Sequence, residues 1–193
     1  MRAIRKLCVY CGSAGAVDVR YREAARELGE RMAAAGLELI FGGGRVGLMG
    51  VLADAVLAAG GRVVGIIPER LRDAELAHRG VSELVIVANM HERKRHMAER
   101  ADAFAVLPGG IGTLDETFEI LTWRQLGLHD KPIFAVDVDG YWQPLLQLLD
   151  HLVANGFSPP LVPQLLQVVP DVAALIAALE RTPAGGAARS ELL

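Results

Sequence analysis

The chain has 193 residues, a formal net charge of -3 and 52% hydrophobic residues, which suits one compact domain of about 150 to 200 residues. Its 20 Lys and Arg residues do not exceed its 23 Asp and Glu residues, which argues against binding to nucleic acid or to an anionic membrane surface. No apolar run approaches the roughly 18 residues of a membrane span, and the first apolar run is too short for a secretory signal. We therefore expect a cytoplasmic protein.

Short apolar runs alternate with longer helical patterns along the chain. Six runs have the continuous hydrophobicity of strands buried on both faces: residues 4–10, 37–41, 62–67, 84–87, 103–107 and 132–136. Six segments have helical periodicity: residues 21–35, 48–59, 90–101, 114–126, 141–155 and 172–180.

Parallel strands need crossovers of this kind, so the alternation predicts an α/β fold. We expect a doubly wound, mostly parallel sheet with helices on both faces and ligands at the carboxyl ends of its strands. Residues 1–181 would form the single domain. Residues 182–193 are small and Gly-rich without an apolar face, which predicts a disordered tail.

Two glycine-rich loops each follow a predicted strand and open a predicted helix, at residues 41–50 and 107–116. Backbone N–H groups can approach an anion where side chains are missing, and a helix N-terminus adds partial positive charge. Both loops are therefore candidate phosphate sites. The alternative is that the glycines only allow tight turns, although two such loops on one sheet edge favour a ligand.

The first loop contains Gly42-x-Gly44-x-x-Gly47, which matches a dinucleotide-binding fingerprint. The fingerprint also needs an acid at the end of the following strand, and here Glu69 comes only after Ile66-Ile67-Pro68. A dinucleotide is therefore disfavoured. No Gly-Lys-Ser/Thr follows either loop, so a P-loop grip on a nucleoside triphosphate is excluded.

The second loop carries Thr113-x-x-Glu116, which has the spacing of a helix capping box. In that interpretation Thr113 is the N-cap and Glu116 reaches back to it. In the competing interpretation Glu116 points into the cleft as a general base, or as a carboxylate that stabilises positive charge.

Arg93 and Lys94 fall on the apolar stripe of their predicted helix, together with Met97 and Ala101. Snorkelling, or an ion pair with a neighbouring helix, would explain two inward cations. Alternatively they face the carboxyl edge of the sheet, where a guanidinium could clamp a phosphate or ribose and keep Glu116 ionised.

We expect no metal or redox site at Cys8 and Cys11. Residues three apart on a strand point to opposite faces, and the chain has no second cysteine pair. The five histidines lack metal-ligand spacing, and no Gly-x-Ser-x-Gly marks a serine nucleophile. We therefore expect no metal.

The glycine loops, Met90-His91-Glu92-Arg93-Lys94 and Pro108-Gly109-Gly110-x-Gly112-Thr113-x-x-Glu116 together resemble the motifs of one family. The chain is similar to the LOG ("lonely guy") phosphoribohydrolases, once labelled possible lysine decarboxylases. The resemblance implies a homodimer of Rossmann-like subunits. It also implies hydrolysis, without a cofactor, of the N-glycosidic bond of a cytokinin riboside 5'-monophosphate to free base and ribose 5-phosphate.

The resemblance also implies roles for individual residues. Arg93 and Glu116 would be the catalytic pair. The residues implied to bind the substrate fall into three groups: Gly109, Gly110, Gly112 and Thr113 for the 5'-phosphate, Ser13, Gly43 and Gly44 in support of them, and Glu75, Lys94 and Thr122 along the rest of the pocket.

The residue chemistry agrees with this role for Glu116, because a carboxylate can stabilise the oxocarbenium-like state of ribosyl cleavage and activate water. A nucleosidase that accepts plain AMP is a close alternative. A nucleotide or cofactor carrier without turnover is another, since fold and glycine loops do not separate binding from catalysis. The decarboxylase label is not supported, because the chain is short for a pyridoxal phosphate enzyme and offers only Lys6, Lys94 and Lys131 for a Schiff base.

Overall fold

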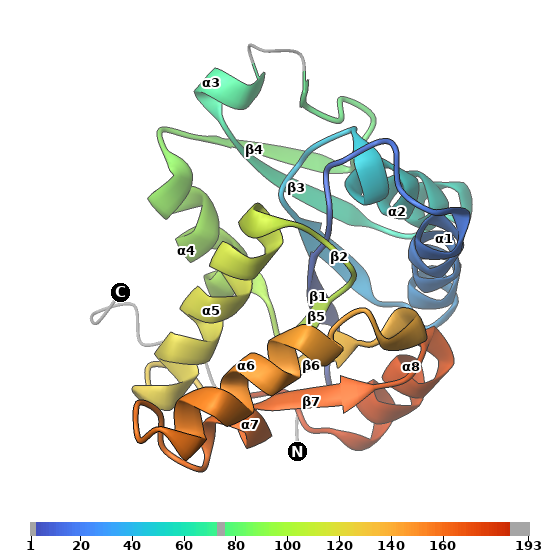
Figure 1. The fold of residues 1–193 in the computed structure, drawn as a ribbon. Helices are drawn as coiled ribbons and strands as arrows, with labels where there is room; N and C mark the ends of the chain where they lie inside the picture. The colour runs from blue at the N-terminus through green and yellow to red at the C-terminus, as the bar shows by residue number, and fades with distance from the viewer. Residues whose placement is uncertain (1–2, 73–75, 186–193) are drawn as a thin grey trace.

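The computed structural model describes residues 3–72 and 76–185 (Figure 1). Within these residues seven strands form one parallel sheet in the order β4-β3-β2-β1-β5-β6-β7. The strands are β1 Lys6–Tyr10, β2 Glu38–Phe41, β3 Val63–Pro68, β4 Glu83–Val87, β5 Ala103–Val106, β6 Ile133–Val136 and β7 Leu166–Val169. The predicted α/β class and parallel sheet are confirmed.

Six helices match the six predicted segments, with bounds that differ by a few residues, whereas the short helices at Glu69–Leu71 and Val162–Leu165 were not predicted. The helices are α1 Val19–Ala34, α2 Gly47–Ala58, α3 Glu69–Leu71, α4 Met90–Arg100, α5 Ile111–Gln125, α6 Gln143–Ala154, α7 Val162–Leu165 and α8 Val172–Arg181, with a 3-10 turn η2 at Val138–Gly140. The side chains of Asp18, Asn89 and Asp171 accept hydrogen bonds at the starts of α1, α4 and α8, as helix N-caps do.

Helices cover both faces of the sheet. One core cluster joins α1, α2 and α8 to one face, and the second joins α4, α5, α6 and α7 to the other (Figure 1). Strand β1 feeds both cores because its side chains alternate: Leu7 and Val9 lie in the first, Cys8 and Tyr10 in the second.

The two edges of the sheet differ from the prediction. Strand β7 was not among the six predicted strands, because Gln167 interrupts its apolar run. Strand β4 was predicted to be buried on both faces, yet it lies at the opposite edge and Ile86 is 38% exposed. A continuous apolar run therefore did not distinguish an edge strand from a central one.

The order of the strands places a crevice at the centre of the sheet. The chain builds β1 to β4 outward in one direction and then returns through α4 to β5, which pairs with β1 on its other side. Helix α4 packs across β3, β2 and β1 on the way. Ligands of open α/β sheets bind where the strand order reverses in this way.

Two further predictions concern the ends of the chain and the membrane. Among the described residues no helix has both the length and the apolarity to span a bilayer. Of the predicted tail, residues 182–185 are described, and Ala184 packs against the first core. The remainder, residues 186–193, lies outside the described residues.

Candidate active site

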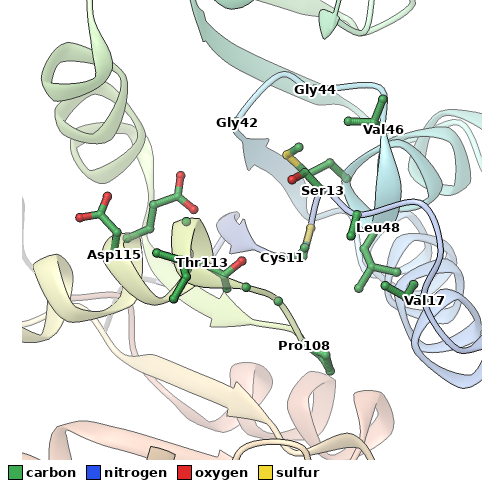
Figure 2. Close-up of a pocket in the computed structure, with 18 of the residues that line it drawn as sticks. Cys11, Ser13, Val17, Gly42, Gly44, Val46, Leu48, Pro108, Thr113 and Asp115 are labelled. Atoms are coloured by element: carbon green, nitrogen blue, oxygen red, sulfur yellow. The ribbon is translucent and has the colours of Figure 1, made fainter.

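A pocket of about 570 Å³ opens at the carboxyl ends of the strands. Its walls are the loops after β1, β2, β3, β5 and β6 together with the first turns of α4 and α5. Figure 2 shows Gly42 and Gly44 on one side of it and Thr113 and Asp115 on another, with Cys11 and Ser13 between them. The pocket lies at the edge of the sheet where ligands were expected.

The glycines of the first loop are required by the fold. Gly43 and Gly47 have φ values of 71° and 60°, which other residues rarely adopt. A Cβ on Gly47 would overlap the backbone of Ser13, and Leu48 N donates to the carbonyl of Gly12 at 2.9 Å. The Gly12 carbonyl therefore takes up an amide of the first turn of α2, and the tight-turn interpretation accounts for Gly43 and Gly47.

The second loop leaves its helix N-terminus open. Helix α5 has Gly110 as its N-cap, with no side chain bonded there. A Cβ on Gly110 or Gly112 would meet no atom within 4 Å, and neither glycine has a positive φ. Neither the fold nor the packing demands glycine at these positions, so backbone N–H groups here can be approached closely by an anion.

The predicted capping box is wrong, because α5 begins two residues earlier than Thr113. Thr113 is the third helical residue, and Glu116 lies a turn inside the helix. A cap with an N-x-x-E spacing occurs on α4 instead: Glu92 N donates to Asn89 Oδ1, and Ala88 N donates to Glu92 Oε2, both at 2.9 Å.

Glu116 and Arg93 meet in the lining of the pocket. Arg93 Nη2 lies 3.6 Å from Glu116 Oε1, and the two side chains are 11% and 9% exposed. Within the described part of the chain Arg93 Nε has no hydrogen-bond partner. Burial raises the pKa of Glu116 to about 6, although the charge of Arg93 opposes that rise. The pocket thus holds a carboxylate that titrates near neutral pH beside a guanidinium with spare donor capacity.

Two contacts position Arg93. Its guanidinium packs against Gly42, where a Cβ would overlap it. At the other end of α4, the ammonium of Lys131, which is only 2% exposed, donates to the carbonyls of Ala98 at 2.6 Å and Glu99 at 3.5 Å. The helix that carries Arg93 is therefore held at both ends, since Asn89 caps its start.

Lys94 and Thr122 do not line the pocket of this chain. Lys94 pairs with Asp115 at 3.1 Å and Glu119 at 3.0 Å on α5, which is the ion pair with a neighbouring helix considered above. Thr122 is exposed, and its hydroxyl donates to the Phe118 carbonyl at 2.7 Å.

The other predicted site residues divide as follows. Gly43 does not line the pocket, and its carbonyl accepts from His78 N at 2.8 Å. Glu75 lies outside the described residues. The pocket brings together eight predicted residues: Ser13, Gly44, Arg93, Gly109, Gly110, Gly112, Thr113 and Glu116.

Several lining residues were not predicted. Tyr141 lies just after β6, and Leu71 and Leu76 lie after β3. All three follow the carboxyl ends of strands, as the glycine loops do. They belong to no recognisable sequence motif, so the sequence alone did not single them out.

The lining changes character along the sheet edge. Beyond β5 and β6 it presents the open N-terminus of α5, whereas beyond β2 and β3 it presents apolar side chains. These are Val46, Leu48, Met49, Ile67, Leu71 and Leu76. The Arg93–Glu116 pair comes from α4 and α5 and lines the same pocket.

Comparison with known proteins adds independent information. Residues 49–179 match the sequence model of a family described as "Possible lysine decarboxylase". A "Probable cytokinin riboside 5'-monophosphate phosphoribohydrolase" of Oryza sativa subsp. japonica is 47% identical over 91% of this chain and 78% of its own length. A cytokinin riboside 5'-monophosphate phosphoribohydrolase of Arabidopsis thaliana is 42% identical over 91% and 83%.

Among solved structures, the molybdenum cofactor carrier protein of Chlamydomonas reinhardtii superposes with a TM-score of 0.71. It is 21% identical and covers 92% of this chain and 96% of its own. At this identity the likeness concerns the fold alone.

Proposed function

The chain belongs to the LOG family of phosphoribohydrolases, and on this premise we propose that it hydrolyses the N-glycosidic bond of cytokinin riboside 5'-monophosphates. The products are the free N6-modified adenine and ribose 5-phosphate. The observation that carries the proposal is the buried Glu116–Arg93 pair beside an open helix N-terminus in one pocket.

The 5'-phosphate binds at the start of α5. The N–H groups of the first helical turn are unsatisfied by the helix itself, and the helix dipole favours an anion there. Gly110 and Gly112 support this position, because nothing in the fold explains why they lack side chains. Phosphate binding at a point remote from the scissile bond then orients the ribose.

Glu116 faces the sugar. Departure of the base leaves positive charge on the ribose ring, which a carboxylate stabilises, and the same carboxylate can take a proton from the attacking water. The charge of Arg93 favours the ionised form of Glu116, and Arg93 lines the same pocket beside it. Water gives its hydroxyl to C1' of the ribose, and its remaining proton passes by way of Glu116 and solvent to the nitrogen of the departing base, so the hydrolysis balances.

The base lies toward the ends of β2 and β3. A hydrocarbon group on N6 of the base can pack against the apolar side chains there. The bare amino group of AMP would be buried there without a hydrogen-bond partner, which is unfavourable. A preference for N6-isopentenyl-AMP over AMP is the measurable consequence.

Release of ribose 5-phosphate from N6-isopentenyl-AMP and from AMP tests the proposal directly. Glu116→Gln should lower kcat by about 100- to 1000-fold, the range for loss of one preorganised charge-stabilising group. It should leave nucleotide binding nearly unchanged. Glu99→Gln is a matched control, because Glu99 does not line the pocket and its carboxylate pairs with Arg95 on the surface at 3.9 Å. Equal turnover in wild type and Glu116→Gln would contradict the role of Glu116.

The same assay addresses the carrier alternative. A carrier would bind the nucleotide tightly and release no ribose 5-phosphate, and Glu116→Gln would then alter neither quantity. The homodimer implied by the resemblance and the cytoplasmic location expected from the apolar runs of the sequence stay predictions. Sedimentation velocity of the purified chain measures the first, and fractionation of the source cells the second.

A further inference from the structure

Tyr141 contacts the proposed phosphate-binding turn from a separate part of the chain. It follows β6, and its hydroxyl donates to the Gly109 carbonyl, 32 residues away, at 2.7 Å. Both residues line the pocket. This bond joins the loop after β6 to the turn that opens α5.

The peptide group that Tyr141 holds is the one that presents the first amide of the turn. In a planar trans peptide the C=O of Gly109 and the N–H of Gly110 point in opposite directions. A fixed Gly109 carbonyl therefore fixes the direction of the Gly110 N–H. Gly110 has no side chain to restrain it and nothing within 4 Å of a built Cβ, so this bond limits the freedom that glycine would otherwise have.

Two further contacts hold the turn, at Pro108 and at Gly109. Gly12 N donates to the Pro108 carbonyl at 3.0 Å, and a Cβ on Gly109 would overlap the Thr113 hydroxyl. Gly109 is thus held between the loop after β1 and the first turn of α5, with its carbonyl bonded to Tyr141.

Tyr141 is itself rigidly supported. The carboxylate of Asp137 accepts from Trp142 N and from Gln143 Nε2, each at 2.6 Å. The Tyr141 ring packs edge-on against Tyr21 at 5.3 Å and Trp142 at 4.9 Å between ring centroids. Such aromatic contacts restrict the ring, so the hydroxyl reaches Gly109 from a fixed platform.

We propose that Tyr141 is a positioning residue that sets the orientation of the Gly109–Gly110 peptide for the 5'-phosphate; this rests on the proposed function. A tyrosine hydroxyl has a single proton to donate. Because that proton is used at the Gly109 carbonyl, the hydroxyl has none left for a phosphate oxygen. Tyr141 therefore acts on phosphate through the turn.

Tyr141→Phe removes the hydroxyl and keeps the ring. Kinetics with N6-isopentenyl-AMP should show KM raised about tenfold, as expected for the loss of one neutral hydrogen bond, and kcat changed less than about threefold. With the riboside that lacks the phosphate, kcat/KM should stay within about twofold of wild type. Thr182→Val is the control, because it also removes one side chain-to-backbone bond, to Ala178 at 2.8 Å, at the end of α8.

Calorimetric binding of AMP separates this proposal from the proposed function, because it needs no turnover. Affinity for AMP should fall about tenfold in Tyr141→Phe, and affinity for adenosine should not change. Equal losses with phosphorylated and unphosphorylated ligands, or no loss with either, would overturn the role of Tyr141. A wild-type protein that binds AMP without hydrolysing any nucleotide would overturn the proposed function only, whereas one that binds no AMP would overturn both.

Discussion

The guanidinium of Arg93 occupies the space that a side chain on Gly42 would need. Gly42 begins the loop after β2, and Arg93 comes from α4, which crosses from the edge of the sheet to its centre. The place of the buried cation beside Glu116 thus depends on a missing side chain 51 positions earlier in the chain.

Gly42→Ala should therefore displace Arg93 and lower kcat/KM by about 100-fold, the typical effect of moving a catalytic group by about 1 Å. Ribose 5-phosphate release measures this loss. Gly15→Ala is the matched control, because a Cβ on Gly15 meets no atom within 4 Å and Gly15 does not line the pocket. Wild-type activity in Gly42→Ala would show that the position of Arg93 is not critical.

Gly112→Ala should separate stability from binding. Gly112 lies in the first turn of α5 with open space around it, so alanine should leave the free energy of unfolding unchanged or raise it by about 0.5–1 kcal/mol. The added methyl group should at the same time raise KM for the 5'-monophosphate. Urea unfolding and steady-state kinetics on the same variant test both effects, and an unaltered KM would place the phosphate elsewhere.

The pH dependence of kcat/KM should reflect the ionisation of Glu116. Burial raises its pKa to about 6, and the proposed reaction needs the ionised form, so kcat/KM should rise as the pH rises through about 6. The charge of Lys94 lowers this pKa while Asp115 and Glu119 raise it. Lys94→Met should therefore move the midpoint of the profile to higher pH.

A surface lysine is the control for that shift. Lys6 pairs with Glu38 at 3.7 Å on the surface, and Lys6→Met should leave the midpoint in place. A Lys94→Met profile that overlays the wild-type profile would mean that the pairs on α5 do not influence Glu116.

His129 should make the fold sensitive to acid. It is 5% exposed, and burial lowers its pKa from 6.5 to about 4, although its bond to the Ile120 carbonyl favours the charged form. The unfolded chain therefore takes up a proton between pH 6.5 and 4 that the folded protein excludes. Its contribution to stability is complete above pH 6.5 and is lost as the pH falls through 4.

This loss amounts to about 2–3 kcal/mol. Urea unfolding between pH 7 and pH 4 should show a shallower decline in His129→Gln than in wild type, whereas His151→Gln, at an exposed position on α6, should decline as wild type does. Identical slopes for His129→Gln and wild type would assign the acid sensitivity to other groups.

The alternation of strand and helix predicted the fold class because it is encoded locally, in runs of apolar residues and their spacing. The strands at the two edges of the sheet were harder to predict from the sequence. Strand β7 needed its partner β6 to be recognised, and β4 is exposed because it is the edge strand of the sheet that the described residues form.

The active site likewise has features that the local sequence predicts and features that it does not. Helical periodicity predicted that Arg93 and Lys94 face inward, and both are buried. It did not predict that Lys94 meets Asp115 and Glu119, or that a carbonyl of the loop after β1 takes up an amide of the first turn of α2. Those contacts join segments far apart in the sequence, so two loops of similar composition have different surroundings in the fold.

The burial of the Lys131 ammonium determines how the contact that holds α4 responds to concentrated salt. Dissolved ions weaken the attraction between charges that face the solvent, such as Arg31 and Glu27 on α1, but they do not reach a cation sealed under the end of α4. The anchorage of the helix that presents Arg93 should therefore be as firm at high ionic strength as at low.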